Sequence, residues 1–184
     1  AMPKSGGSFT GNIATKGITS VTLGTSNFVA GVNAGNSIVS GGNYNTVVGD
    51  EAGTAITTGD NNTAVGYAAL DANTTASYNT AIGTYAGQNI TTGATNTAVG
   101  DAALASTTTA SDNTAVGQGS LNANTTGASN TAVGRNALYT NTTGHSNVAL
   151  GANALDVNTT GSENTALGFN ALSANTTAGA NTSI

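Results

Sequence analysis

Residues 62–78 read NTAVGYAALDANTTASY, and the next 17 residues, 79–95, read NTAIGTYAGQNITTGAT. The same pattern opens at nine positions spaced 17 residues apart, which are Asn45, Asn62, Asn79, Asn96, Asn113, Asn130, Asn147, Asn164 and Asn181. A looser copy that is one residue longer opens at Asn27. Such periodicity indicates a repeat architecture in which each unit contacts its neighbours. We number unit positions from the opening Asn, which is position 1.

The 17-residue unit predicts one coil of a parallel β-solenoid. Helix-pair repeats normally need about 30 residues or more. No stretch sustains the apolar spacing of a helix, whereas Thr, Val and Ile favour strands and recurrent Gly and Asn oppose helices. We therefore expect an all-β fold, a β-solenoid or β-roll of stacked 17-residue coils. Because each coil has only about two large aliphatic side chains to bury, we also expect a parallel homotrimer, a fibre similar to a triple β-helix.

The repeat divides the chain into three regions. Residues 1–8 are expected to be a cloning remnant and a flexible lead, residues 9–44 irregular N-terminal coils, and residues 45–184 the regular β-repeat rod. The last unit opens at Asn181 and stops at its fourth residue, Ile184. We therefore expect a fragment of a longer chain, truncated at the C-terminus.

Comparing the units position by position predicts interior and surface. Position 4 is always Val, Ile or Leu, so we expect this column to be buried. Position 9 is Leu in six units, but Gly53 and Gly87 replace it in the two units that carry Ile56 and Ile90 at position 12. This exchange predicts that positions 9 and 12 fill the same interior space. Ala at position 3 and Ala or Ser at position 8 predict a close approach by backbone or by a partner chain.

The invariant and the variable polar positions lead to separate expectations. Gly at position 5 predicts a positive φ or a tight bend. Asn at positions 1 and 12 and Thr at positions 13 and 14 suit stacked side-chain ladders. All eight acidic residues fall at positions 6, 7, 10, 16 or 17, which vary between units, so we expect them to face solvent.

Composition opposes several classes of function. Only 6% of residues are charged and three are basic, which is too few to form a basic surface for the phosphates of nucleic acid. The absence of Cys excludes disulfides and thiolate metal sites, and no apolar run is long enough for membrane insertion. The single histidine, His145, is interpreted as an exposed turn residue. We therefore expect no catalytic residue, no cofactor, no metal site and no enzymatic activity.

One metal-binding alternative is open. Asp50, Glu51 and Asp60 could meet on adjacent corners and bind Ca²⁺ weakly. No recognised calcium loop is present, and solvated surface charge is the preferred interpretation.

Aromatic residues provide the candidate receptor contacts. Five of the few aromatic side chains occupy variable positions, and they are Tyr67, Tyr78, Tyr85, Tyr139 and Phe169. Exposed rings can stack on sugar faces, and Asn and Thr can bond to hydroxyl groups. Single exposed aromatics are also common without any function, which is the alternative interpretation of these residues.

The segments 62–66 (NTAVG) and 79–83 (NTAIG) resemble the repeat motif of the YadA-like heads of trimeric autotransporter adhesins. They are even more similar to the Asn/Thr-rich repeats of bacteriophage tail fibres. The resemblance covers about residues 27–184. It implies a rigid trimeric rod in the virion tail fibre that presents or forms a surface for a host cell-surface receptor, with polysaccharide as one class of receptor. The adhesin heads have a shorter unit and the fuller motif NSVAIG, which leaves the shape of the coil open.

Two alternatives are compatible with the same repeat. The chain could be the head domain of a bacterial trimeric adhesin on the bacterial cell surface. It could also be an ice-binding solenoid, because position 2 and position 13 or 14 would supply outward Thr columns.

Overall fold

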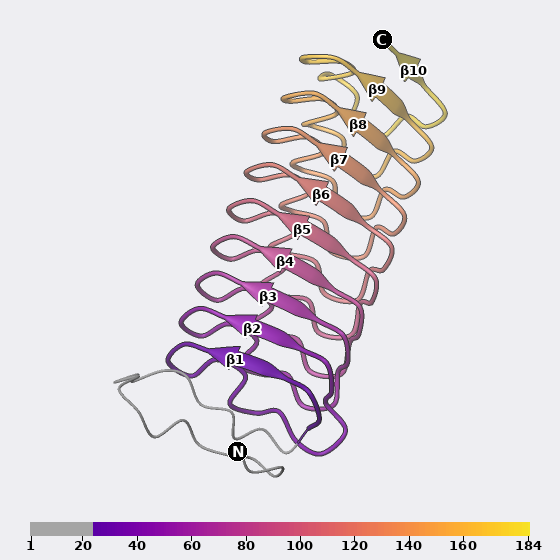
Figure 1. The fold of residues 1–184 in the computed structure, drawn as a ribbon. Helices are drawn as coiled ribbons and strands as arrows, with labels where there is room; N and C mark the ends of the chain where they lie inside the picture. Colours follow the sequence, from indigo (N-terminus) through magenta and orange to yellow (C-terminus); the bar gives the residue numbers. More distant parts are fainter. Residues whose placement is uncertain (1–23) are drawn as a thin grey trace, which may run out of the picture.

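The computed structural model describes residues 24–184 as a stack of similar coils (Figure 1). The expectations for residues 1–8 and for the start of the irregular coils, 9–23, lie outside these residues. Each coil contributes one short strand. The strands are β1 (Phe28–Ala30), β2 (Thr46–Val48), β3 (Thr63–Val65), β4 (Thr80–Ile82), β5 (Thr97–Val99), β6 (Thr114–Val116), β7 (Thr131–Val133), β8 (Val148–Leu150), β9 (Thr165–Leu167) and β10 (Thr182–Ser183). They form one parallel sheet in sequence order, which confirms the all-β solenoid.

The register of the sheet follows the repeat. In β3 and β4, Thr63 pairs with Thr80, and the following residues pair in step. The longer coil that opens at Asn27 is also in register, because Phe28 pairs with Thr46. Its extra residue lies between a bond to the next coil, where Val39 N donates to Thr57 O at 3.1 Å, and a bond within its own coil, where Asn27 Nδ2 donates to Gly42 O at 2.8 Å. A corner near position 14 therefore absorbs an insertion without disturbing the sheet.

The interior of the rod is filled from opposite sides of each coil. Ala at positions 3 and 8 is buried in nearly every described coil, and so is Leu at position 9 or Ile at position 12. A Cβ built on Gly87 would lie 3.0 Å from Ile90 Cδ1 and 3.6 Å from Ala81 Cβ. Positions 3, 9 and 12 therefore share one space, which confirms the predicted exchange. Positions 3 and 8 face the interior of their own chain, so of the two alternatives expected there, the close approach comes from the chain itself.

Position 4 is not buried within its own chain, contrary to the expectation, and its side chains are half-buried or exposed. Side chains alternate along a strand, so Thr at position 2 and the aliphatic residue at position 4 both point away from the inward Ala at position 3. Ile82 and Leu167 remain 42% and 45% exposed. The physical reason is that the interior beside the strand is already occupied by Leu or Ile from the opposite side of the coil. Only small side chains fit there in most coils.

Buried Asn side chains connect the coils, as the ladder prediction expected. Asn130 N donates to Asn113 Oδ1 at 3.0 Å, and Asn130 Nδ2 donates to Gly144 O of its own coil at 2.8 Å. At position 12, Asn141 Nδ2 donates to Asn124 Oδ1 at 2.9 Å. Most amides at position 1 thus close their own coil and also accept a bond from the backbone of the next, whereas Asn113 Nδ2 donates to Ser111 O of the preceding coil. Such paired groups avoid the cost of burying a polar atom without a partner.

Threonine at positions 13 and 14 behaves differently at the two places. Thr125 Oγ1 at position 13 donates to Thr142 O of the next coil at 3.0 Å, and the same bond recurs along the stack. The position 14 side chains are exposed in every described coil, and their hydroxyl groups bond to no other described residue. The ladder prediction is therefore confirmed for position 13 and wrong for position 14.

The glycine at position 5 turns the chain directly after each strand. Gly100 has a φ of +133°, and a Cβ built on it would lie 2.7 Å from the carbonyl carbon of Gly117 in the next coil. An L-residue is excluded both by this backbone conformation and by the close approach of the neighbouring turn. The predicted positive φ is confirmed.

A candidate receptor-contact strip

Variable side chains gather beyond this turn, along one edge of the rod. Backbone bonds hold the edge in register, since Tyr85 N donates to Tyr67 O at 2.9 Å and Gly119 N donates to Asp101 O at 2.9 Å. On the other side of the loop, Ala123 N donates to Tyr139 O at 3.0 Å. We call this surface the variable strip and define it as the side chains at positions 6, 7 and 10 of the coils that open at Asn45 through Asn164. Its rigid backbone fixes the spacing of variable side chains.

Four of the five predicted contact residues belong to the variable strip. Tyr67 and Phe169 occupy position 6, Tyr85 position 7 and Tyr139 position 10. Tyr78 occupies position 17, shortly before β4. It therefore lies at the opposite end of the strands from positions 6 and 7 and does not join the others. Phe169 is the most exposed ring and has no aromatic neighbour within the described part of the chain. The structure thus brings together only some of the predicted residues.

Tyr67 and Tyr85 form a pair on neighbouring coils. Their ring centroids are 5.4 Å apart and the rings are nearly perpendicular, at 78°. Such edge-to-face contacts are favourable beyond the area that they bury. The Glu51 carboxylate raises the pKa of Tyr67 above its ordinary value of 10.0, with smaller contributions from Tyr85, partial burial and Asp50. The pair is therefore an ordered aromatic surface beside negative charge.

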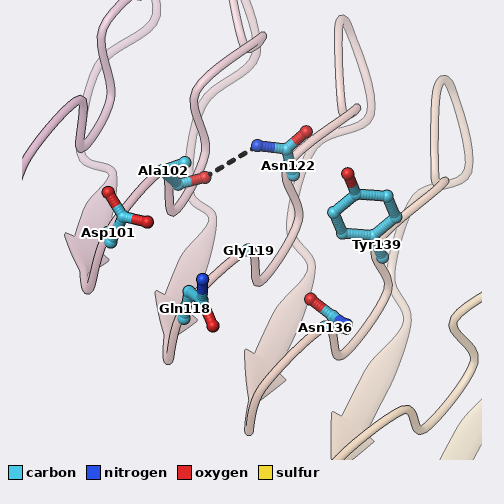
Figure 2. A pocket seen from close by; sticks show the side chains of 7 residues that line it. All are labelled: Asp101, Ala102, Gln118, Gly119, Asn122, Asn136 and Tyr139. Atoms are coloured by element: carbon cyan, nitrogen blue, oxygen red, sulfur yellow. Dashed lines mark hydrogen bonds between the residues drawn. The ribbon is translucent and has the colours of Figure 1, made fainter.

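Tyr139 lies beside a polar hollow of about 210 Å³ (Figure 2). The lining comes from three successive coils and consists of Asp101, Ala102, Gln118, Gly119, Asn122, Asn136 and Tyr139. Asn122 Nδ2 donates to Ala102 O at 3.0 Å, which anchors this amide to the preceding coil. The amide oxygen of Asn122 has no partner among the described residues. The hollow thus combines one aromatic ring with one carboxylate and three amides.

Gly119 leaves room for the Asn136 amide and the Tyr139 ring to pack against the turn beside this hollow. It is the only glycine at position 7 between the coils of Asn45 and Asn164. A Cβ at Gly119 would lie 2.7 Å from Asn136 Oδ1 and 3.3 Å from two ring carbons of Tyr139. Sequence reasoning missed Gly119, Asn122 and Asn136 because it ranked residues by type. The loss of a side chain at one variable position was the available signal.

Other polar side chains do not form a site of this kind. His145 is exposed, as predicted, and its backbone N–H donates to Ser162 Oγ at 3.1 Å. All eight acidic residues are exposed or half-buried, as expected for solvent-facing positions, although Asp156 Oδ1 is buried and has no hydrogen-bond partner among the described residues. Within residues 24–184, no three His, Cys, Asp or Glu side chains form a metal-binding group, so the calcium alternative at Asp50, Glu51 and Asp60 is wrong.

The outward face of the sheet is a second notable surface. We call the position 4 side chains the aliphatic ladder, and they are Val48, Val65, Ile82, Val99, Val116, Val133, Leu150 and Leu167. Thr at position 2 runs beside them, and no charged side chain of the described residues lies on this face. The ladder is separated from the variable strip by the turn at position 5.

These features define the class as a parallel β-solenoid repeat protein. No family model, no curated protein and no solved structure matches the chain. A helix long and apolar enough to span a membrane is absent from the part of the chain that the structure describes.

Proposed function

We propose that this chain is a rigid segment of a bacteriophage tail fibre, a homotrimeric rod that presents a receptor-binding surface to the host cell. The observation that carries the proposal is the aliphatic ladder, an unbroken apolar column on a regular, in-register rod. We propose a structural and adhesive role, not an enzymatic one.

The aliphatic ladder supports the association of identical chains. Parallel sheets are normally covered on both faces, and here one face packs on the core while the other is open. Extended apolar surface on a soluble protein commonly marks an interface. Burying the exposed remainder of each aliphatic side chain is worth roughly 1 kcal/mol, and the ladder repeats this gain in every coil. Because identical rods have ladders of identical spacing, another copy of this chain is the matching partner.

The rod geometry supports a spacer and presenting role. Stacked coils form a continuous sheet without a hinge from β1 to β10. The variable strip lies around a corner from the aliphatic ladder, so side chains there stay accessible when ladders meet. Invariant residues build the rod, whereas the variable residues differ between coils and can be selected for recognition.

Light scattering at micromolar concentration tests the assembly. We expect a mass three times that of the chain, which is 17.6 kDa, and an assembly that resists heat or detergent. A monomeric mass would refute the proposed trimer. Binding of the fluorescently labelled rod to intact bacteria tests the attachment role. Neighbouring tail and baseplate genes would support the phage origin, whereas a membrane anchor encoded in the same chain would favour the adhesin head.

The position 14 threonines favour one further candidate, an ice-binding function. Their side chains form an exposed column with free hydroxyl groups along the rod. Thermal hysteresis of the purified protein would support this candidate if it is lost when several of these threonines are replaced by lysine. Absence of hysteresis would exclude it.

A further inference from the structure

We propose that the hollow beside Tyr139 binds one neutral hexopyranosyl residue of a cell-surface polysaccharide. The sugar face would lie against the Tyr139 ring, and its hydroxyl groups would bond to the side chains of Asp101, Gln118, Asn122 and Asn136. This inference rests on the proposed attachment function and adds the class of ligand and its location on the variable strip.

The aromatic ring supplies the apolar part of such a site. Tyr139 is 41% exposed, and its ring borders the hollow, as Figure 2 shows. A sugar has one face rich in C–H groups, which contacts an aromatic ring favourably, and a tyrosine loses little conformational entropy on binding. Because Gly119 has no side chain, the Tyr139 ring can pack closely against this turn, which helps to hold the ring beside the hollow.

The polar groups around the ring suit hydroxyl groups. Sugar hydroxyls donate and accept, and the amides of Gln118, Asn122 and Asn136 offer both functions. Asn122 is already anchored through its bond to Ala102 O, so its free amide oxygen is held ready to accept a bond. Fixed polar groups reduce the ordering cost of binding.

The charge of the hollow selects against anionic ligands. Asp101 is the only charged residue in the lining, and its carboxylate can accept bonds from hydroxyl groups. The nearest cationic side chain in the sequence, Arg135, is not part of the lining. Within the lining, a phosphate or a uronic acid would meet the Asp101 carboxylate without a cation to offset it. A neutral sugar is therefore the better match.

The dimensions of the hollow suit a single ring. Its volume of about 210 Å³ is smaller than the roughly 300 to 1,000 Å³ of pockets for drug-sized ligands. The hollow is open to solvent along the strip, so a polysaccharide could enter with its neighbouring residues outside. Single-ring recognition at the surface of a rod requires no internal cavity.

Saturation-transfer NMR on the complete protein tests the site, with methyl pyranosides of glucose, galactose, mannose and N-acetylglucosamine as probes. We expect at least one neutral probe to bind at about 10 mM, where a site with a Kd near 1 mM would be mostly filled. Methyl glucuronide should bind more weakly. Tyr139→Ala and Asp101→Asn should each weaken binding by about fivefold to tenfold, because one removes the stacking face and the other a charge-assisted acceptor.

Two further variants locate the effect. Gly119→Ala places a methyl group against the Asn136 amide and the Tyr139 ring, which must both shift, and it should also weaken binding. Its backbone is tolerant, because Ala68 and Ala102 hold the same left-handed conformation at position 7, with φ of 51° and 54°. Tyr44→Ala removes an exposed tyrosine that belongs neither to the strip nor to the predicted contact residues, and it should leave binding unchanged. Circular dichroism of each variant checks that the rod is folded.

The outcomes separate this inference from the proposed function. No binding by any neutral probe, or equal binding by Tyr139→Ala and the unchanged protein, overturns the sugar site. Light scattering on the same samples reports the assembly independently. A trimer without sugar binding overturns the sugar site alone, whereas a monomer that binds sugar through Tyr139 overturns the trimer and leaves the site in place.

Discussion

Leucine at position 9 adopts a backbone conformation that leucine rarely holds. Leu70 has a φ of 51°, and the other leucines of this column are similar. A left-handed conformation costs roughly 1 to 2 kcal/mol for a residue with a side chain, but complete burial of leucine gains roughly 1.5 to 3 kcal/mol. Gly87 avoids this strain and leaves the space to Ile90. The two solutions are close in free energy, which explains why both occur in one rod.

The coil that opens at Asn62 allows a test of this exchange. Asn73 Oδ1 is buried and has no hydrogen-bond partner, because the neighbouring coils carry Ile56 and Ile90 at the same position. Leu70→Gly alone should destabilise the protein by about 2 to 4 kcal/mol, as expected for a large core truncation. Adding Asn73→Ile should recover most of this loss, since it fills the space and removes an unpaired oxygen. Denaturant unfolding of the single and double variants measures both effects.

No recovery in the Leu70 and Asn73 double variant would show that the two positions do not share one interior space. Leu104→Gly with no second change is the control, because its coil keeps Thr107 at position 12, where the hydroxyl donates to Asn124 O at 3.1 Å. That variant should stay destabilised.

A pH titration reports the arrangement of the Tyr67 corner. Because the pKa of Tyr67 is raised, its neutral form is favoured in the folded protein. The associated stabilisation is present below the ordinary tyrosine pKa and is lost as pH rises through the folded value. Glu51→Gln removes the largest cause and should lower the pKa of Tyr67 towards 10.0, as measured by NMR of the ring carbons. Glu163→Gln, in a distant coil, should leave it unchanged.

At the scale of the coil, the corner and the strand differ in how they tolerate length changes. The Asn27 coil accommodates its extra residue between Val39 and Gly42, while β1 stays in register with β2. One glycine inserted between Thr126 and Gly127, the matching corner, should cost less than about 1 kcal/mol, because loop closure depends weakly on length. The same insertion between Thr114 and Ala115 reverses the alternation of β6 and should cost several times more. Thermal unfolding of both variants measures the difference, and equal losses would contradict the corner assignment.

The coil architecture was predictable from the sequence. Which side chains of each strand point into the interior was not predicted correctly. An invariant period and the exchange between positions 9 and 12 reveal the stack and part of its core. The aliphatic column at position 4 was placed inside because size was taken as the guide to burial. The alternation in Thr63, Ala64 and Val65 carries the correct answer, since polar Thr and Val must share one face of a short strand.

The hollow at Tyr139 was only partly predictable for a related reason. Tyr139 stands out in the sequence because aromatics are scarce. Gly119 and Asn136 contribute only through contacts between successive coils, and their importance depends on how close stacked side chains come. An alignment of the coils predicts which residues are neighbours in the stack. Only the three-dimensional structure shows whether a hollow lies between those neighbours.

At the scale of the whole molecule, the open sheet face determines whether the chain is a monomer or associates with other copies. A chain-to-chain interface along the aliphatic ladder has to exclude charge, because an unpaired charge is costly to bury. Val133 and Val157 provide a matched pair, with exposures of 36% and 37%. Val133 belongs to the ladder, whereas Val157 occupies position 11, away from the strand. We expect Val133→Glu to weaken the trimer, so that its apparent mass in light scattering falls on dilution, while Val157→Glu remains trimeric. Both variants should keep the same circular dichroism spectrum, because each side chain lies outside the core of its own chain. If the two variants behave alike, the chains associate through another face and the apolar ladder needs a different partner.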